Sequence, residues 1–108
     1  MVARLTIPTR LVLESLLADP DAELYGLELA RRAGLPTGTV HPILARLEST
    51  GWVTSRWEDV DPAEAGRPPR RYYRLTATGR RDGHARLAKA PRPRVALQTA
   101  PTPKVVLP

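Results

Sequence analysis

The chain has 108 residues, no cysteine and a net charge of +6 at pH 7. This length fits a single domain, and the missing cysteines exclude disulfides, thiolate metal sites and cysteine nucleophiles. No apolar run approaches the roughly 18–20 residues of a membrane span. The start "MVARLTIPTR" lacks the apolar segment and cleavage site of a signal peptide, so we expect a cytoplasmic protein.

Two short helices are predicted first along the chain. Thr6 and Pro8 favour a helix start, and the leucines of "LVLESLL" recur at helical spacing, which predicts a helix from about Pro8 to Ala18. The turn residues of "DPDAEL" end it. The segment "YGLELARRAG" is predicted to form a second helix, which Gly34 stops.

A third helix is predicted over about residues 37–50, after the short connection "LPTGT". Four apolar residues follow the i, i+3, i+4, i+7 spacing of a buried helix face: Val40, Ile43, Leu44 and Leu47. Pro42 is tolerated if Thr39 is the N-cap, because the N–H of the third helical residue has no partner to lose. The helix is therefore expected to start near Thr37–Thr39 and to end at Gly51.

Two alternating segments, "WVTSRWE" and "RRYYRLT", predict an antiparallel hairpin around the loop "DVDPAEAGRPP". Val53, Ser55 and Trp57 share one face of the first strand, and Tyr73 and Leu75 anchor the second. Trp52 and Trp57 at such positions are more often packing residues than the lining of a drug pocket.

A possible fourth helix, "ATGRRDGHARLAKA", runs to about Ala90, although Gly79 and Gly83 weaken it. The remaining 18 residues contain five prolines, which predicts a flexible tail. We therefore expect one folded domain over residues 1–90 and a proline-rich tail over 91–108.

This order of elements predicts an α+β, mostly α, winged helix-turn-helix fold with a three-helix core and a two-stranded β-wing. In a helix-turn-helix the second helix of the pair enters the major groove. The hairpin that follows can run along phosphates or enter the minor groove.

The charge is unevenly distributed in a way that supports this interpretation. Residues 1–64 carry 6 basic and 10 acidic residues, a balance of −4, whereas residues 65–108 carry 11 basic and 1 acidic residue, a balance of +10. Strong basicity confined to one half indicates a polyanionic partner, most often nucleic acid. A solvated tail that improves solubility explains the same composition.

On the third helix, the candidate DNA contacts are Thr37, Gly38, Thr39, His41 and Arg46. At least one threonine is expected to cap the helix, and the free N–H groups at a helix start also bind phosphates. His41 lies off the apolar stripe and should be exposed. A metal site is not expected, because His84 is the only other histidine.

On the wing, the candidate DNA contacts are Arg67, Arg70, Arg71 and Arg74. The prolines beside them stiffen the loop, so less ordering entropy is lost when the arginines meet phosphates. A solvated loop is the alternative. Asp59, Asp61 and Glu64 would repel DNA, so they either point away from it or hold the arginines in place before binding.

Two segments together resemble the PadR-type transcriptional regulators: "YGLELARRAGLPTGTVHPILARLESTGWVTSRWE" and "GRPPRRYYRLTATGRR". The resemblance covers about Leu11 to Arg81. It implies a bacterial, nucleoid-associated repressor that binds an inverted-repeat operator as a homodimer. PadR-type proteins usually carry a tyrosine at the position of His41, and the segment that would form their dimer helix is short here.

Nothing in the sequence indicates an enzyme or a cofactor site. There is no nucleophile beside a base, no glycine-rich phosphate loop and no metal-ligand cluster. The leading hypothesis is a sequence-specific repressor that reads the major groove with residues 37–50 and contacts phosphates or the minor groove with residues 67–71. A protein-interaction module and a nonspecific nucleic-acid binder are the alternatives.

Overall fold

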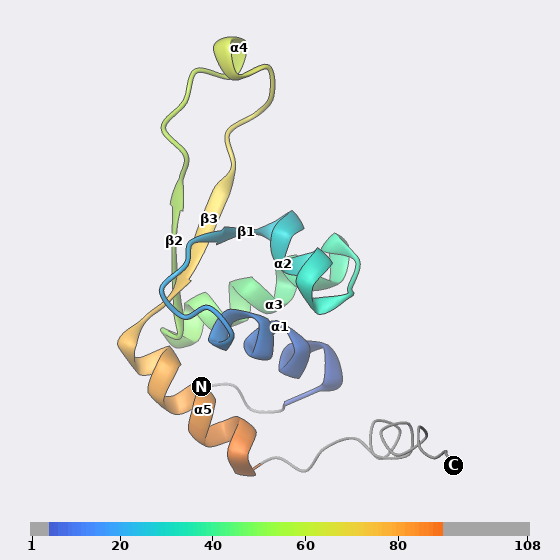
Figure 1. Cartoon of the computed structure of the whole chain (residues 1–108), viewed down its shortest axis with the longest axis vertical. Helices are drawn as coiled ribbons and strands as arrows, with labels where there is room; N and C mark the ends of the chain where they lie inside the picture. Colours follow the sequence, from blue (N-terminus) through green and yellow to red (C-terminus); the bar gives the residue numbers. More distant parts are fainter. Residues whose placement is uncertain (1–4, 90–108) are drawn as a thin grey trace, which may run out of the picture.

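A computed structural model describes residues 5–89. In chain order the elements are α1 (Ile7–Leu17), β1 (Leu24–Tyr25), α2 (Gly26–Ala33), α3 (Thr37–Thr50), β2 (Val53–Trp57), α4 (Pro62–Ala65), β3 (Arg71–Leu75) and α5 (Ala77–Lys89). The hairpin of β2 and β3, with α4 at its end, projects away from the helical body (Figure 1). The predicted proline-rich tail lies outside the described residues.

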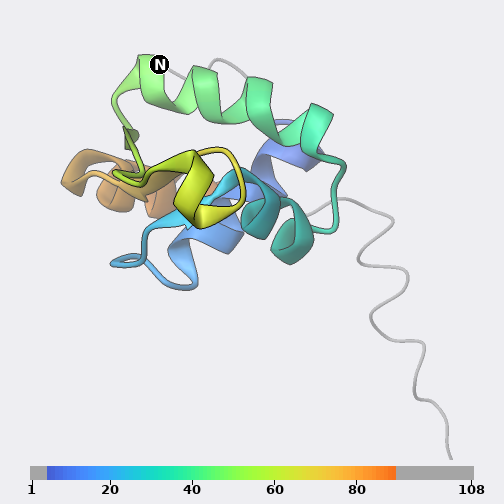
Figure 2. The same cartoon turned by 90° about the horizontal axis from the view of Figure 1, so that it is seen from above.

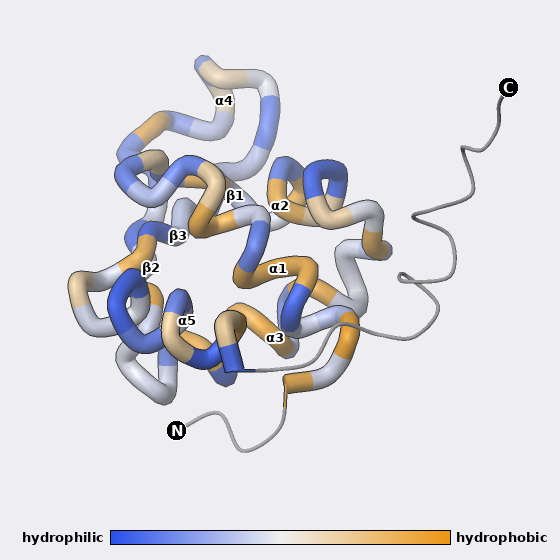
Figure 3. Tube along the Cα trace, turned by 60° about the horizontal axis from the view of Figure 1, so that its bottom comes forward, coloured by the Kyte–Doolittle hydropathy of each residue, from blue (hydrophilic) through white to orange (hydrophobic). Residues whose placement is uncertain are grey.

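The core lies between the inner faces of α1, α2 and α3. The predicted stripe of α3 is buried in full, and it packs with Leu13 and Leu16 of α1 and Leu29 of α2. Each fully buried aliphatic side chain contributes about 1.5–3 kcal/mol of transfer free energy. Hydrophobic residues accordingly gather along α1 and α3 (orange in Figure 3).

The first two helices begin where their capping residues allow. The Thr6 side chain accepts a hydrogen bond from the Thr9 N–H at 3.3 Å, so α1 starts at Ile7, one residue before the prediction. Tyr25 is the N-cap of α2 and donates its N–H to Glu28 Oε1 at 3.2 Å. Gly34 ends α2 with a φ of 71°, as predicted.

The start of α3 corrects two predictions. Pro36 is the N-cap and no side chain caps the helix, so the expected threonine cap is wrong. Because Thr37 is the first helical residue, Pro42 is the sixth rather than the third. Pro42 therefore cannot donate to the carbonyl of Gly38. Both residues are exposed, and water can reach that carbonyl.

The wing is the predicted two-stranded hairpin of β2 and β3. The sheet has a third strand in the described region, in the order β1-β3-β2, which the sequence did not predict. The additional strand, β1, pairs antiparallel with β3 through Leu24↔Tyr73 and Tyr25↔Tyr72. Trp52 is buried as predicted, whereas Trp57 is 61% exposed and does not pack in the core.

The predicted fourth helix forms as α5, and its two glycines hold it close to the body. The Thr76 hydroxyl accepts from the Gly79 N–H at 3.0 Å and donates to the Gly51 carbonyl at 2.6 Å. A Cβ on Gly79 would overlap the carbonyl oxygen of Trp52, and one on Gly83 would lie 3.6 Å from Leu13. The helices and hairpin together form a winged helix-turn-helix. No helix among residues 5–89 is both long and apolar enough to cross a membrane.

Candidate nucleic-acid interface

The outer face of α3 is exposed over its whole length. Because the apolar stripe is buried, the opposite side of the helix carries the exposed residues Thr37, Gly38, His41, Pro42, Ala45, Arg46 and Ser49. Thr39 is half-buried. Seen from above, α3 lies along one edge of the molecule beside the wing (Figure 2). This exposed face can contact a partner whose surface has a groove wide enough for an α-helix.

The position of His41 depends on a glycine in another helix. A Cβ on Gly26 would lie 2.6 Å from His41 Cε1 and 3.2 Å from His41 Nε2, so the imidazole rests against the bare backbone of Gly26. His41 is exposed, as predicted. Arg46 is also exposed, and no carboxylate among residues 5–89 pairs with it. Both polar side chains therefore face solvent on one surface.

The wing, residues 53–75, contains its own short helix. Asp61 is the N-cap of α4 and its Oδ1 accepts a hydrogen bond from the Ala63 N–H at 2.9 Å. Gly66 ends α4 with a φ of 72°. One of the three acids that the sequence left unexplained therefore caps a helix. Asp59 and Glu64 are exposed.

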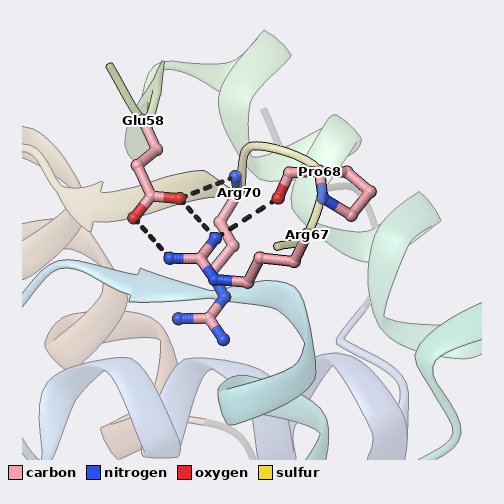
Figure 4. A network of polar contacts seen from close by, with 4 residues as sticks. All are labelled: Glu58, Arg67, Pro68 and Arg70. Atoms are coloured by element: carbon pink, nitrogen blue, oxygen red, sulfur yellow. Dashed lines mark hydrogen bonds and ion pairs between the residues drawn. The ribbon is translucent and has the colours of Figure 1, made fainter. Parts of the chain in front are cut away.

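Glu58 binds the first wing arginine at the end of the strand ladder. Both of its carboxylate oxygens accept hydrogen bonds from the Arg67 guanidinium, at 2.6 and 3.0 Å, and Oε1 also accepts from the Arg70 N–H at 3.2 Å (Figure 4). The bond from Arg67, aided by the Arg70 N–H, lowers the pKa of Glu58 from 4.5 to about 2 against the effect of burial.

Arg71 connects the wing to α3. Its Nε donates to Ser55 Oγ at 3.0 Å, and its Nη2 lies 3.5 Å from Glu48 Oε1. Ser55 in turn donates to Glu48 Oε2 at 2.6 Å. The guanidinium also lies 5.4 Å from the centre of the Trp57 ring. The exposed Trp57 is thus part of a cation–π pair on the α3 side of the wing.

Arg70 and Arg74 alternate with Arg71 and face the other side of the wing. Arg70 lies 4.3 Å from the centre of the Tyr25 ring. Arg74 is exposed. It makes no ion pair among residues 5–89, although its charge helps to lower the pKa of Glu23. On the same side, Arg56 binds Glu23 through two contacts of 2.7 Å.

The structure thus separates the four predicted wing arginines, which the sequence had grouped as one cluster. Arg67 and Arg71 form ion pairs with carboxylates and Arg70 stacks on a tyrosine. Arg74 makes no ion pair within the described region but interacts electrostatically with Glu23. Sequence reasoning missed Glu58 and Glu48 as their partners. The strand register could have identified Glu58, because a hairpin that pairs residue 57 with residue 71 places residue 58 opposite Arg70.

Comparisons with solved structures agree with the winged helix-turn-helix fold. A PadR family regulator from Clostridium difficile R20291 superposes with a TM-score of 0.61 at 24% identity, covering 78% of this chain and 86% of that one. A structure of Bacillus subtilis PadR in complex with operator DNA gives 0.61 at 17% identity, covering 87% of this chain but only 58% of that one.

A third structure shows that the fold is shared more widely. The MarR family regulator SPO1453 from Silicibacter pomeroyi DSS-3 gives a TM-score of 0.55 at 23% identity, covering 87% of this chain and 57% of that one. A comparison with curated proteins gives no match. The family is identified by the sequence profile described as "Transcriptional regulator PadR-like family", which matches residues 12–85. This chain belongs to the PadR-like family of transcriptional regulators.

Proposed function

We propose that this protein is a sequence-specific, double-stranded DNA-binding repressor. The observation that carries the proposal is the exposed outer face of α3, which lies beside a wing that stands clear of the body (Figures 1 and 2). A single α-helix fits the major groove of B-form DNA. The related structure with operator DNA has the same fold, which supports a similar use of the surface here.

Helix α3 is the proposed reading element. Thr37, Gly38 and Thr39 form its first turn. The Thr39 N–H donates to the Pro36 carbonyl at 3.0 Å, and no side chain caps the N–H groups of Thr37 and Gly38. Such N–H groups bind phosphate oxygens well. His41 and Arg46 follow on the exposed side and can donate hydrogen bonds to base edges or phosphates.

The wing is the proposed phosphate-contacting element. Arg70 and Arg74 interact electrostatically with Glu58 and Glu23, but their guanidinium groups make no ion pair within the described residues. They can therefore approach phosphates without first breaking an ion pair. Arg71 lies on the same side of the wing as Glu48 of α3, which suits contact with a duplex held by α3. Arg67 differs from these arginines, because its guanidinium forms an ion pair with Glu58.

We further propose that two copies bind one inverted-repeat operator. A dimer with twofold symmetry places two copies of α3 in successive major grooves, about 34–36 Å apart. The support is the family relationship. The symmetry of the bound sequence and the mass of the complex test it directly.

Selection from random duplex DNA with the full chain tests the function. A specific repressor should enrich one motif and bind it about 10³–10⁷-fold more tightly than random duplex. A scrambled duplex of the same length and base composition is the matched control. Recovery of no motif, with equal affinity for both duplexes, would contradict the proposal.

A further inference from the structure

Glu58 is the residue through which the wing loop is joined to the strand ladder. Its N–H donates to the Arg70 carbonyl at 2.7 Å, and its Oε1 accepts from the Arg70 N–H. Beyond it, the loop residues 59–69 make hydrogen bonds among themselves, as in α4. Within the described chain, their hydrogen bonds to other residues are those from Arg67 to Glu58.

The ion pair between Glu58 and Arg67 is bidentate and partly shielded from water. The side chain of Glu58 is 16% exposed and that of Arg67 is 32% exposed. Bidentate pairs of arginine and carboxylate fix both position and orientation. Arg67 also donates to the Pro68 carbonyl at 3.2 Å, so its guanidinium is held at three points (Figure 4).

We propose that Glu58 is a specificity-determining residue of the DNA site, because it holds Arg67 away from indiscriminate contact with phosphates and fixes the wing loop before binding. This inference rests on the proposed function. Nonspecific binding is electrostatic, and its strength increases with the number of protein cations that are free to replace counterions on DNA. An arginine paired with a carboxylate adds little to that count.

The fixed loop has the opposite effect on the specific complex. A segment that is already ordered loses less conformational entropy when it docks. Glu58 therefore weakens binding to random DNA while it preserves binding to the operator, and the ratio of the two affinities rises. The same carboxylate would have a different effect if it acted only by repelling DNA, since it would then weaken binding to both duplexes alike.

The test compares Glu58→Gln with Glu64→Gln in the full chain. Both changes remove one negative charge from the wing, but Glu64 is exposed and has no hydrogen-bond or ion-pair partner among residues 5–89. Affinities for the selected operator and for a random duplex of equal length are measured over a series of salt concentrations.

We expect Glu58→Gln to tighten binding to random duplex by about three- to tenfold and to steepen its salt dependence by about one unit, as for one added phosphate contact. Operator binding should not tighten, so the affinity ratio falls at least about threefold. Glu64→Gln should leave the ratio within about twofold. Hydrogen exchange should accelerate over residues 59–69 only in Glu58→Gln.

The double variant Glu58→Gln/Arg67→Gln keeps the wild-type net charge and removes the freed cation. It should return random-duplex affinity to the wild-type value, and circular dichroism confirms that each variant is folded. Equal shifts of the ratio in Glu58→Gln and Glu64→Gln would overturn the inference and leave the repressor proposal standing. A wild-type chain that does not distinguish operator from random duplex would overturn the proposed function and this inference with it.

Discussion

Arg71 of β3 lies 3.5 Å from Glu48 of α3, and both side chains contact Ser55 of β2. The proposed reading helix and the wing are therefore connected by side chains of α3, β2 and β3, and not only by the backbone at Gly51. A rigid connection of this kind sets the angle at which a duplex meets both elements.

Replacing Glu48 by alanine should loosen this connection. Glu48 accepts from Ser55 and pairs with Arg71, both partly exposed, so we expect the free energy of unfolding to fall by about 1 kcal/mol. Urea denaturation measures the change. Ser49→Ala, on the exposed side of the same helix, should change stability by less than about 0.5 kcal/mol. Equal effects of the two substitutions would show that the connection has no energetic role.

The two glycines of α5 should respond to alanine in opposite ways. Gly79→Ala places a methyl group on the Trp52 carbonyl, which we expect to destabilise the fold by about 1–3 kcal/mol. Gly83→Ala meets only ordinary contacts at 3.6 Å and gains helix propensity of up to about 1 kcal/mol. Thermal unfolding of both variants measures the difference. Similar melting temperatures would mean that α5 does not pack against Trp52 in this way.

Gly26→Ala should move the imidazole of His41. A methyl group at residue 26 would lie 2.6 Å from His41 Cε1, but that ring is the end of an exposed side chain, so the fold should lose less than about 1 kcal/mol. If His41 contacts DNA, Gly26→Ala should reduce the magnitude of the free energy of operator binding by more than it lowers the free energy of unfolding. A double-mutant cycle with His41→Ala should then be non-additive. Additive losses would mean that the two residues act independently.

Sequence reasoning succeeded where the signal is periodic and local. The buried stripe of α3 and the glycine stops at Gly34 and Gly51 follow from helical spacing and from left-handed backbone angles. The two-residue strand β1 is too short to show alternation, and it exists because β3 pairs with it. Trp57 is exposed because it is the last residue of β2, in a hairpin that projects away from the helical body (Figure 1).

Sequence reasoning named candidate DNA contacts, which stay a prediction, but it did not foresee how their side chains are paired in the folded chain. An exposed arginine and an arginine bound to a carboxylate look the same in a sequence. Glu58 and Arg67 lie nine residues apart and meet only because α4 and Gly66 fold the loop back. Such a contact depends on loop geometry that no short-range pattern encodes.

Stability in acid should depend on Glu58. Its pKa is lowered from 4.5 to about 2 in the folded chain, so its ionised form favours folding at every pH above 4.5. That contribution should diminish as the pH falls from 4.5 and be lost below about 2. Urea midpoints of the wild type and of Glu58→Gln should therefore differ most above pH 4.5 and converge toward pH 2. A constant difference across this range would contradict the pairing.

Arg70→Ala should weaken binding to all duplexes and make the salt dependence shallower by about one unit, as for one lost phosphate contact. The reason is that its guanidinium stacks on Tyr25 and makes no ion pair in the described region. Arg31→Ala removes the same charge from an exposed position at the end of α2 and should change the salt dependence less. Identical salt dependence in wild type and Arg70→Ala would exclude this contact.

Successive residues of β3 face opposite sides of the wing, and this alternation decides where the hairpin tolerates changes in length. Adding a residue near α4 would lengthen the tip and leave the pairing of β2 with β3 intact. Adding one between Tyr73 and Leu75, with Leu75 kept in register, would turn Tyr73 out of the core and exchange the sides on which Arg70 and Arg71 lie. Variation in wing length among related proteins should therefore be concentrated near Pro62–Ala65. A loop taken from another wing should also be inserted at this position.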